Sequence, residues 1–373
     1  MEIPNEILRD ILFDTVKEES VRVDSETEFP LGPGVGRSPW SESNLYRASV
    51  VCRRWRAMIL DLPVWNTVEI YHDSPECPDE MARKCGFLSW LTHRVAEKGR
   101  ILDVTLRVEG RATNWPSLAL LKLVDAPVIW RSFSYISQYS TSVDQLYTVM
   151  QGLRSRFREW QSFALEMNYA EKFQNMSMME VVNMVQEMKG LKLLEMKLGV
   201  GGEIWRWGDW RRPGHAVLCG PFTWVTTLSV SASAEVKVCW LMLSICPRVT
   251  TASICLEYRD YSQLPWENSL QCPKLLLKHL EKLSVFVRPD MERTYDFVFL
   301  SLECRALQWF AVEWTTDTDT EGLEAVKGFL SRVVGIRAGL SGEVWLPGGT
   351  TSDWEFLQEV GLVPREYPQM DYL

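Results

Sequence analysis

Apolar residues recur along the chain in short alternating runs, and longer apolar segments separate these runs. Seven runs have the form apolar-x-x-apolar-x-apolar and begin at residues 130, 160, 191, 225, 249, 280 and 307; shorter ones lie at 102–106 and 344–346. Alternation with a period of two predicts strands that bury one face. The segments at 143–157, 178–188, 236–245 and 323–334 are long enough for helices. The pattern therefore predicts an α/β fold in which strands and helices alternate.

The runs repeat at a nearly regular interval, because their starting positions are 24 to 34 residues apart. Such an interval predicts a solenoid, with parallel strands on one face, helices on the other, and neighbouring units completing one another's core. An ordinary α/β domain with a parallel sheet would show the same alternation without a fixed period. The sequence leaves both architectures open.

The first 66 residues show helical periodicity instead. Ile7, Leu8, Ile11 and Leu12 follow Pro4 at a spacing that predicts an amphipathic helix. Helical periodicity returns at 45–65. Residues at about 18–44 are rich in Asp, Glu, Gly, Pro and Ser, a composition that predicts a disordered insert. The insert is acidic, since residues 1–34 contain nine acids and three bases.

Composition and charge exclude several classes of protein. The 373-residue chain is 46 % apolar, with a net charge of −9 and a pI near 5.2. This acidic balance argues against a nucleic-acid partner, and no run of about 18 apolar residues predicts a membrane span. The acidic N-terminus does not resemble a signal peptide, and nine cysteines without a C-x-x-C pair indicate reduced thiols. We expect an intracellular protein, in the cytoplasm or the nucleus or both.

Motifs of catalysis or metal binding are missing from the sequence. The four histidines are scattered, and neither H-E-x-x-H nor G-x-S-x-G occurs. His72, Cys77, Cys85 and His93 have spacings that fit no common zinc finger. We therefore expect no catalytic residues, no metal site and no cofactor. A hydrolase whose histidines or carboxylates converge only in the fold is the weaker alternative.

The N-terminal residues at 3–8, 45–48, 51–56 and 63–65 closely resemble the F-box, a small three-helix motif. The resemblance implies binding to a Skp-family adaptor, which links F-box proteins to a cullin and a RING subunit in a ubiquitin ligase. The long acidic insert departs from the family pattern. A module of this size cannot bury all its apolar residues, so either a partner or the downstream domain covers the surplus. The implied adaptor contacts are Ile3, Pro4, Ile7, Leu8, Ile11, Leu45, Val50, Val51, Cys52 and Trp55.

The strand runs carry a second resemblance. Residues 246–249 and 272–275 are similar to the Cys-Pro-x-Leu turns of F-box proteins with leucine-rich repeats, and the whole chain resembles the large, divergent set of such proteins in fungi. The resemblance implies an irregular leucine-rich-repeat solenoid. We expect an F-box-like module at 1–66, a connecting segment at 67–98 and the repeats at 99–373.

Two groups of residues are candidates for binding a target protein. Strand residues between the apolar anchors, among them Glu257, Phe286 and Glu313, would share the strand face of a solenoid. The loop at 199–213 is rich in Gly, Trp and Arg, and Trp and Arg supply most binding energy at interfaces. An aromatic loop that caps the solenoid explains the same composition. The loop candidates are Trp205, Arg206, Trp207, Trp210, Arg211 and Arg212.

These observations favour a non-catalytic, substrate-recognition subunit of a Skp–cullin–F-box ubiquitin ligase. The N-terminal helices would bind the adaptor and the repeats would bind an unknown target protein. The alternative is a repeat-based scaffold for protein interactions that recruits no ligase.

Overall fold

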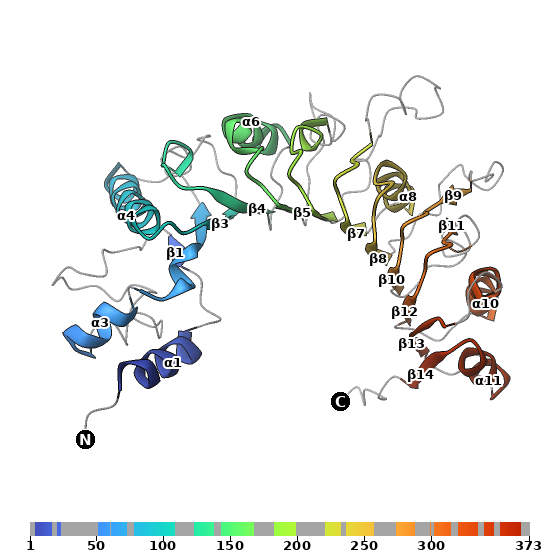
Figure 1. Cartoon of the computed structure of the whole chain (residues 1–373). Coiled ribbons are helices and arrows are strands. Elements are labelled where there is room, and N and C mark those ends of the chain that lie inside the picture. Colours follow the sequence, from blue (N-terminus) through green and yellow to red (C-terminus); the bar gives the residue numbers. More distant parts are fainter. Residues whose placement is uncertain are drawn as a thin grey trace, which may run out of the picture. The chain divides into compact units, whose positions relative to one another are not determined.

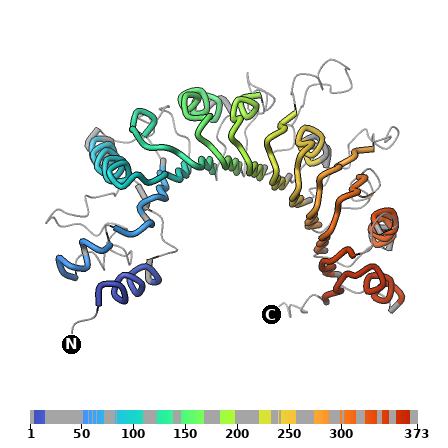
Figure 2. Tube along the Cα trace, in the orientation of Figure 1, coloured from blue at the N-terminus to red at the C-terminus, as the bar shows by residue number. Residues whose placement is uncertain are grey.

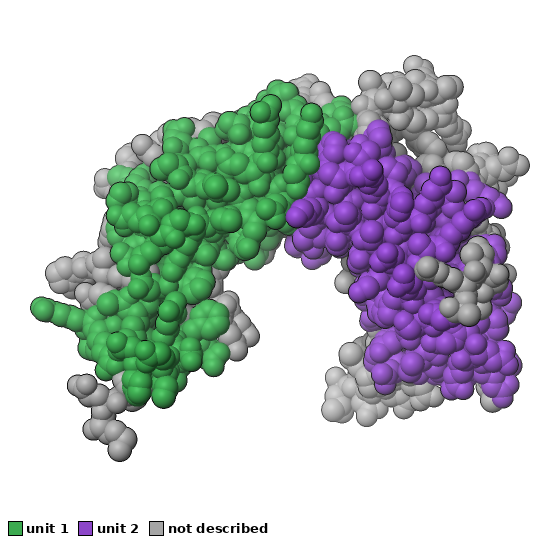
Figure 3. Space-filling model, viewed as in Figure 1, with its two compact units in different colours: residues 1–163, 173–190 green, residues 164–172, 191–373 purple. Residues whose placement is uncertain are grey.

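The structure is a computed structural model of the whole chain. It describes residues 4–16, 21–23, 51–59, 61–72, 78–108, 123–137, 143–167, 183–198, 221–232, 236–256, 274–287, 299, 302–314, 320–334, 339–346 and 351–366. Two compact units are present (Figure 3): unit 1 holds residues 1–163 and 173–190, and unit 2 holds residues 164–172 and 191–373. Both units combine parallel strands with helices, which confirms the predicted mixed α/β fold with a parallel sheet.

In the described part of unit 1, strands β1, β2, β3 and β4 follow one another in chain order and are parallel. Figure 1 shows helices α4 and α6 on the same side of these strands. The elements are α1 (Asn5–Val16), β1 (Val21–Val23), α3 (Arg53–Ile59), the 3-10 helix η2 (Pro63–Asn66), β2 (Thr67–His72), α4 (Pro78–Glu97), β3 (Leu102–Val108), β4 (Trp130–Ser137), α6 (Val143–Leu153) and the 3-10 helix η3 (Arg154–Arg156).

Unit 2 repeats the arrangement, with the parallel order β6-β7-β8-β10-β12-β13-β14 and a separate short pair, β9 with β11. The trace in Figure 2 shows these strands succeeding one another along the unit. The elements are β6 (Leu193–Leu198), β7 (Thr227–Ala232), α8 (Val236–Ile245), β8 (Thr251–Leu256), β9 (Leu275–Leu276), β10 (Lys282–Val287), β11 (Leu302–Glu303), β12 (Trp309–Trp314), α10 (Thr320–Val334), β13 (Ser341–Leu346), α11 (Thr351–Glu359) and β14 (Leu362–Glu366). Strand β5 (Ser162–Met167) begins in unit 1 and continues in unit 2.

Aromatic side chains stack in the core of unit 1, where the predicted runs carry Trp and Phe instead of Leu. The rings of Trp130 and Trp160 lie 6.4 Å apart and nearly parallel, and Phe133 lies 4.9 Å from Trp160. All three side chains are fully buried. Stacked pairs of this kind add to the free energy gained by burial alone. Trp130 and Phe133 of β4 and Trp160, which precedes β5, therefore form one continuous aromatic core.

Helix α4 shows how the sequence ends an element. Phe87, Leu88, Leu91 and Val95 are buried at helical spacing. Gly99 then has a φ of 61° and ends the helix in the left-handed conformation, and the amide of Arg100 donates to the carbonyl oxygen of Val95 at 3.0 Å. This is the hydrogen bond of a glycine C-cap.

Some predicted boundaries differ from the structure. The segment 67–98, expected as a connection, contains strand β2 and helix α4, and β2 pairs with β3. Within the predicted insert, 21–23 form β1, which pairs with β2, while 24–44 lie outside the described residues. The helix expected at 143–157 ends at 153 and continues as a 3-10 turn. Strand β14 was not predicted, because it contains Pro364 and follows α11 directly.

No helix in the described part of the chain is both long and apolar enough to cross a membrane.

Candidate functional site

Helix α1 has two apolar faces, and only one of them is buried. Leu8 and Leu12 are 3 % and 1 % exposed, whereas Ile7 and Ile11 are 53 % and 48 % exposed. Successive helical residues are rotated by about 100° from each other, so these two pairs of residues point in different directions. Leu8, expected to contact an adaptor, is instead part of the core. The exposed pair leaves an apolar face of α1 open to solvent.

Helix α3 lies beside the start of α1 (Figure 1). The Arg54 guanidinium donates to the Asn5 side-chain oxygen, with Nε at 2.9 Å, and this contact joins the two helices. Val51 is 58 % exposed, Cys52 is also exposed, and Trp55 is half-buried. The predicted residues Ile7, Ile11 and Val51 are therefore exposed apolar side chains on two adjoining helical segments.

The segment after α3 is fixed to helix α4. The indole N–H of Trp65 donates to the Ile59 carbonyl oxygen at 2.8 Å, and its ring meets the Trp90 ring edge-on at 5.6 Å. Asp61 accepts a hydrogen bond from Lys98 at 2.8 Å, which lowers the pKa of the Asp61 carboxyl below its ordinary value. Trp90 lies in the C-terminal half of α4, and Lys98 lies in the turn after this helix. The N-terminal helices are thus anchored at one end to the strand-and-helix part of unit 1.

Several predicted contact residues cannot be placed. Ile3, Leu45, Val50 and Glu257, and the whole loop at 199–213 with Trp205, Arg206, Trp207, Trp210, Arg211 and Arg212, lie outside the described residues. Their roles stay predictions.

On unit 2, the strand register assembles a row of larger side chains on the less buried face. Phe286 of β10 pairs with Glu313 of β12, Glu313 pairs with Trp345 of β13, and Trp345 pairs with Arg365 of β14. We call these four residues the aromatic row. Phe286 is 38 % exposed, while its neighbours Val285 and Val287 are buried. The structure therefore brings the predicted residues Phe286 and Glu313 side by side.

Trp345 and Arg365 of the aromatic row were missed by the sequence prediction. The Arg365 guanidinium lies over the Trp345 ring at 6.0 Å and pairs with Glu343 at 3.4 Å. The signal for Trp345 was present, because it lies between the alternating residues Val344 and Leu346. Arg365 gave no signal, since its strand was not predicted. Aromatic and arginine side chains on an open sheet face are typical of protein-interaction surfaces.

Three of the described thiols are buried in the core. Burial raises the pKa of Cys239, Cys246 and Cys304 to about 12, so these thiols stay protonated at neutral pH. Among the residues placed in the structure, no three His, Cys, Asp or Glu side chains come together as metal ligands.

Comparison with known proteins identifies the N-terminal region. A family model described as F-box-like matches residues 1–70, which include α1, β1, α3, η2 and the start of β2. No curated protein matches the chain. F-box-like domains in general bind Skp-type adaptors and are associated with substrate recognition by ubiquitin ligases, and the match covers residues 1–70 of this chain.

Proposed function

We propose that this protein is the substrate-recognition subunit of a Skp–cullin–F-box ubiquitin ligase and has no active site of its own. The observation that carries the proposal is the pair of exposed isoleucines, Ile7 and Ile11, on a helix within the F-box-like region. Each side chain leaves about half of its surface in water, and an adaptor that covers both would gain hydrophobic free energy. Such a complex would act inside the cell, in the cytoplasm, the nucleus or both.

The adaptor surface in this proposal combines α1 with the start of α3. Pro4, Ile7, Ile11, Val51, Cys52 and Trp55 would contact the adaptor, together with Ile3, Leu45 and Val50. Leu8 would contribute indirectly, because its buried side chain holds α1 in place. Through the adaptor, the protein would join a cullin and a RING subunit.

The strand-and-helix units are, in this proposal, divergent leucine-rich repeats that form a solenoid beginning after the F-box-like module. The support is the strand order, which follows the chain without reversal within each unit, and the parallel pairing of successive strands. A doubly wound α/β domain instead reverses its strand order at a switch point. The likeness of the repeats to the divergent fungal set belongs to the same proposal.

A target protein would bind the strand face. The aromatic row on unit 2, with Phe286 and Glu313 at its centre, is the described part of that surface, and the loop at 199–213 and Glu257 are its other proposed contributors. Holding a target in this way would raise the local concentration of its lysines near the ubiquitin-charged enzyme. This chain would then act by proximity alone.

Co-purification with a Skp-family adaptor tests the proposal. We expect wild-type protein to retain the adaptor and the double variant Ile7→Glu, Ile11→Glu to lose it. Placing two carboxylates in an apolar interface costs several kcal/mol, which corresponds to a loss of affinity of about 100-fold or more. Both positions are exposed, so the folded state of the isolated chain should tolerate the change.

Ile129→Glu and Val363→Glu are matched controls. These residues are 59 % and 48 % exposed and lie outside the F-box-like region. They should bind the adaptor like wild type. Failure of wild-type protein to bind, or equal loss in the control variants, would contradict the proposed role.

The alternative is a scaffold that recruits no ligase, and one observation favours it. Strand β1 lies within the F-box-like region and pairs with β2, which itself pairs with β3. The F-box-like region is thus continuous with the sheet of unit 1 instead of forming a separate module. Under this alternative the wild-type protein would not retain the Skp-family adaptor.

A further inference from the structure

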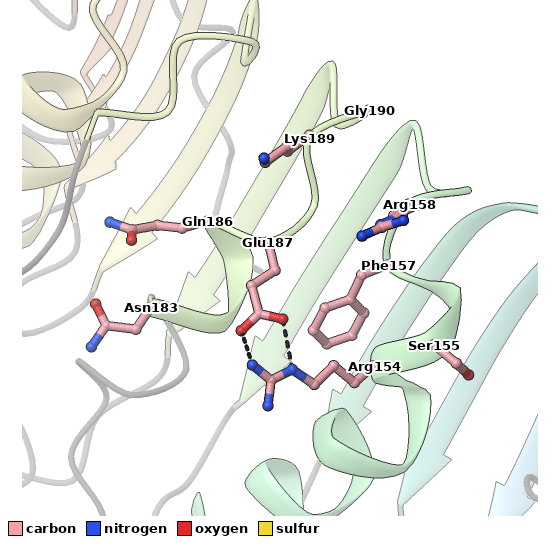
Figure 4. Close-up of a pocket in the computed structure, with 9 residues that line it drawn as sticks. All are labelled: Arg154, Ser155, Phe157, Arg158, Asn183, Gln186, Glu187, Lys189 and Gly190. Carbon is pink, nitrogen blue, oxygen red and sulfur yellow. Dashed lines mark hydrogen bonds and ion pairs between the residues drawn. The ribbon is translucent and has the colours of Figure 1, made fainter.

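A polar pocket lies between two successive turns of unit 1, outside the surfaces described above. One turn is 154–158, after α6, and the other is 183–190, before β6. Its volume is about 990 Å³, at the upper end of the range for ligand sites. Figure 4 shows the side chains that line it. Seven of its nine lining residues are polar or charged, unlike the mostly apolar lining of a small-molecule site.

Positive charge dominates the pocket. It contains three cations, Arg154, Arg158 and Lys189, and one acid, Glu187. The Arg154 guanidinium holds Glu187 through two hydrogen bonds of 2.7 and 2.5 Å, and this contact raises the pKa of Arg154. Arg158 and Lys189 are exposed and form no ion pair with any residue that the structure describes. Two cations are therefore available to a ligand.

The backbone that carries Arg158 and Lys189 is closely packed. Phe157 is buried, and its ring lies 5.1 Å from that of Trp160. Gly190 has no room for a side chain, because a Cβ there would lie 3.1 Å from the Trp160 carbonyl oxygen and 3.3 Å from that of Arg158. The backbone next to Lys189 thus packs directly against the backbone of Arg158. This close packing fixes the spacing of the two backbone positions from which Arg158 and Lys189 project.

We propose that this pocket binds an acidic segment of a partner protein, with a carboxylate between Arg158 and Lys189. Charge-assisted hydrogen bonds from Arg or Lys to a carboxylate are roughly twice as strong as those between neutral groups. A net positive pocket on a chain of net charge −9 is a local exception that favours an acidic ligand. The overall negative charge disfavours a nucleic acid, which would have to approach the whole molecule. The polar lining suits a peptide, whose backbone also needs hydrogen-bond partners.

The proposal goes beyond the adaptor and target surfaces and does not depend on them. Glu187 provides a specific test of the proposal, because its carboxylate already forms an ion pair with Arg154. Replacing Glu187 with Gln removes the only negative charge among the lining residues and frees Arg154 for the ligand. An acidic peptide should then bind more tightly, whereas a pocket that only stabilises the fold would gain nothing.

Fluorescence anisotropy with full-length protein tests the proposal. The probes are a labelled peptide of about eight alternating Glu and Ser residues, the same peptide with Gln for Glu, and a thymidine oligonucleotide of equal charge. We expect only the Glu peptide to bind, and its affinity should fall when salt rises from about 0.05 to about 0.5 M. The double variant Arg158→Gln, Lys189→Gln should weaken binding by about tenfold, and Glu187→Gln should strengthen it by about threefold.

Arg248→Gln, Lys278→Gln is the matched control, since both residues are exposed cations on turns of unit 2. It should bind the Glu peptide like wild type, and far-UV circular dichroism should show that every variant is folded. Absence of binding by wild-type protein, equal binding of the Gln peptide, tighter binding of the oligonucleotide, or equal weakening in the control variant would each overturn the proposal.

Discussion

Arg156 lies between the two pocket arginines in sequence, yet it points into the protein and is expected to stabilise unit 1. Its guanidinium donates to the carbonyl oxygens of Val124 and Val128 at 2.9 Å and also to that of Ala126. It further binds the carboxylate of Glu159 at 3.0 Å. The side chain is only 13 % exposed. One side chain thus satisfies three carbonyl groups in the turn that precedes β4.

The substitution Arg156→Lys keeps the charge and removes the planar fork of donors. A lysine ammonium is a point donor and cannot reach carbonyls on both sides of the turn as the guanidinium does. The Ala126 carbonyl keeps the Val128 amide as a donor, so we expect at least one of the Val124 and Val128 carbonyls to lose its partner, and an unsatisfied buried acceptor costs about 1–2 kcal/mol. The free energy of unfolding should therefore fall by about 1–2 kcal/mol.

Urea unfolding, followed by circular dichroism at neutral pH, measures this loss, and amide hydrogen exchange should show faster opening at 124–130. Arg158→Lys is the matched control. Arg158 is exposed, so the same substitution should change the unfolding free energy by less than about 0.5 kcal/mol. Equal stability of the two variants would refute the reasoning, because the carbonyl contacts of Arg156 would then contribute nothing.

Two further predictions concern a glycine and an ion pair. Gly342 has a φ of 152°, and an added Cβ would overlap the Phe310 carbonyl group, so Gly342→Ala should lower the unfolding free energy by about 3 kcal/mol or more. Gly152 lies in an open helical position, so Gly152→Ala should raise the unfolding free energy slightly. Equal urea midpoints for the two variants would contradict this prediction. Because its hydrogen bond to Lys98 lowers the pKa of Asp61, that carboxylate stabilises the fold above its ordinary pKa near 4, and the contribution is lost as pH falls through the lowered value. Asp61→Asn should therefore be less stable than wild type by about 0.5 kcal/mol at pH 7 in thermal melts, and the difference should shrink as the pH falls below the ordinary pKa of the carboxyl. A difference that grows in acid would have the wrong sign.

The adaptor and pocket proposals depend on different residues of unit 1 and can be tested separately. Adaptor binding needs Ile7 and Ile11 and should not respond to Arg158→Gln, Lys189→Gln. Binding of an acidic peptide needs Arg158 and Lys189 and should not respond to the isoleucine variant. Each variant therefore serves as a control in the other experiment.

The alternation of strands and helices could be predicted from the sequence, because side-chain direction within one element depends on local geometry alone. Alternate residues of a strand point to opposite faces, so runs such as 249–256 and 280–287 identify β8 and β10 without knowledge of the fold. The motif at residues 3–8 and 51–65 likewise predicted the F-box-like region that the family model matches. Segment 67–98 was expected to be a connection, whereas the structure shows strand β2 and helix α4 there, with β2 paired to β3.

Tertiary structure alone decided which of these residues face solvent and which distant residues meet. Leu8 and Ile7 are equally apolar neighbours, but only packing against the rest of unit 1 buries the former and exposes the latter. Arg158 and Lys189 are more than thirty residues apart in the chain and come together only because successive turns stack. Trp345 meets Arg365 through the register of β13 and β14. Burial and neighbourhood depend on contacts between elements, and the one-dimensional pattern does not specify which side chains those contacts cover or bring together.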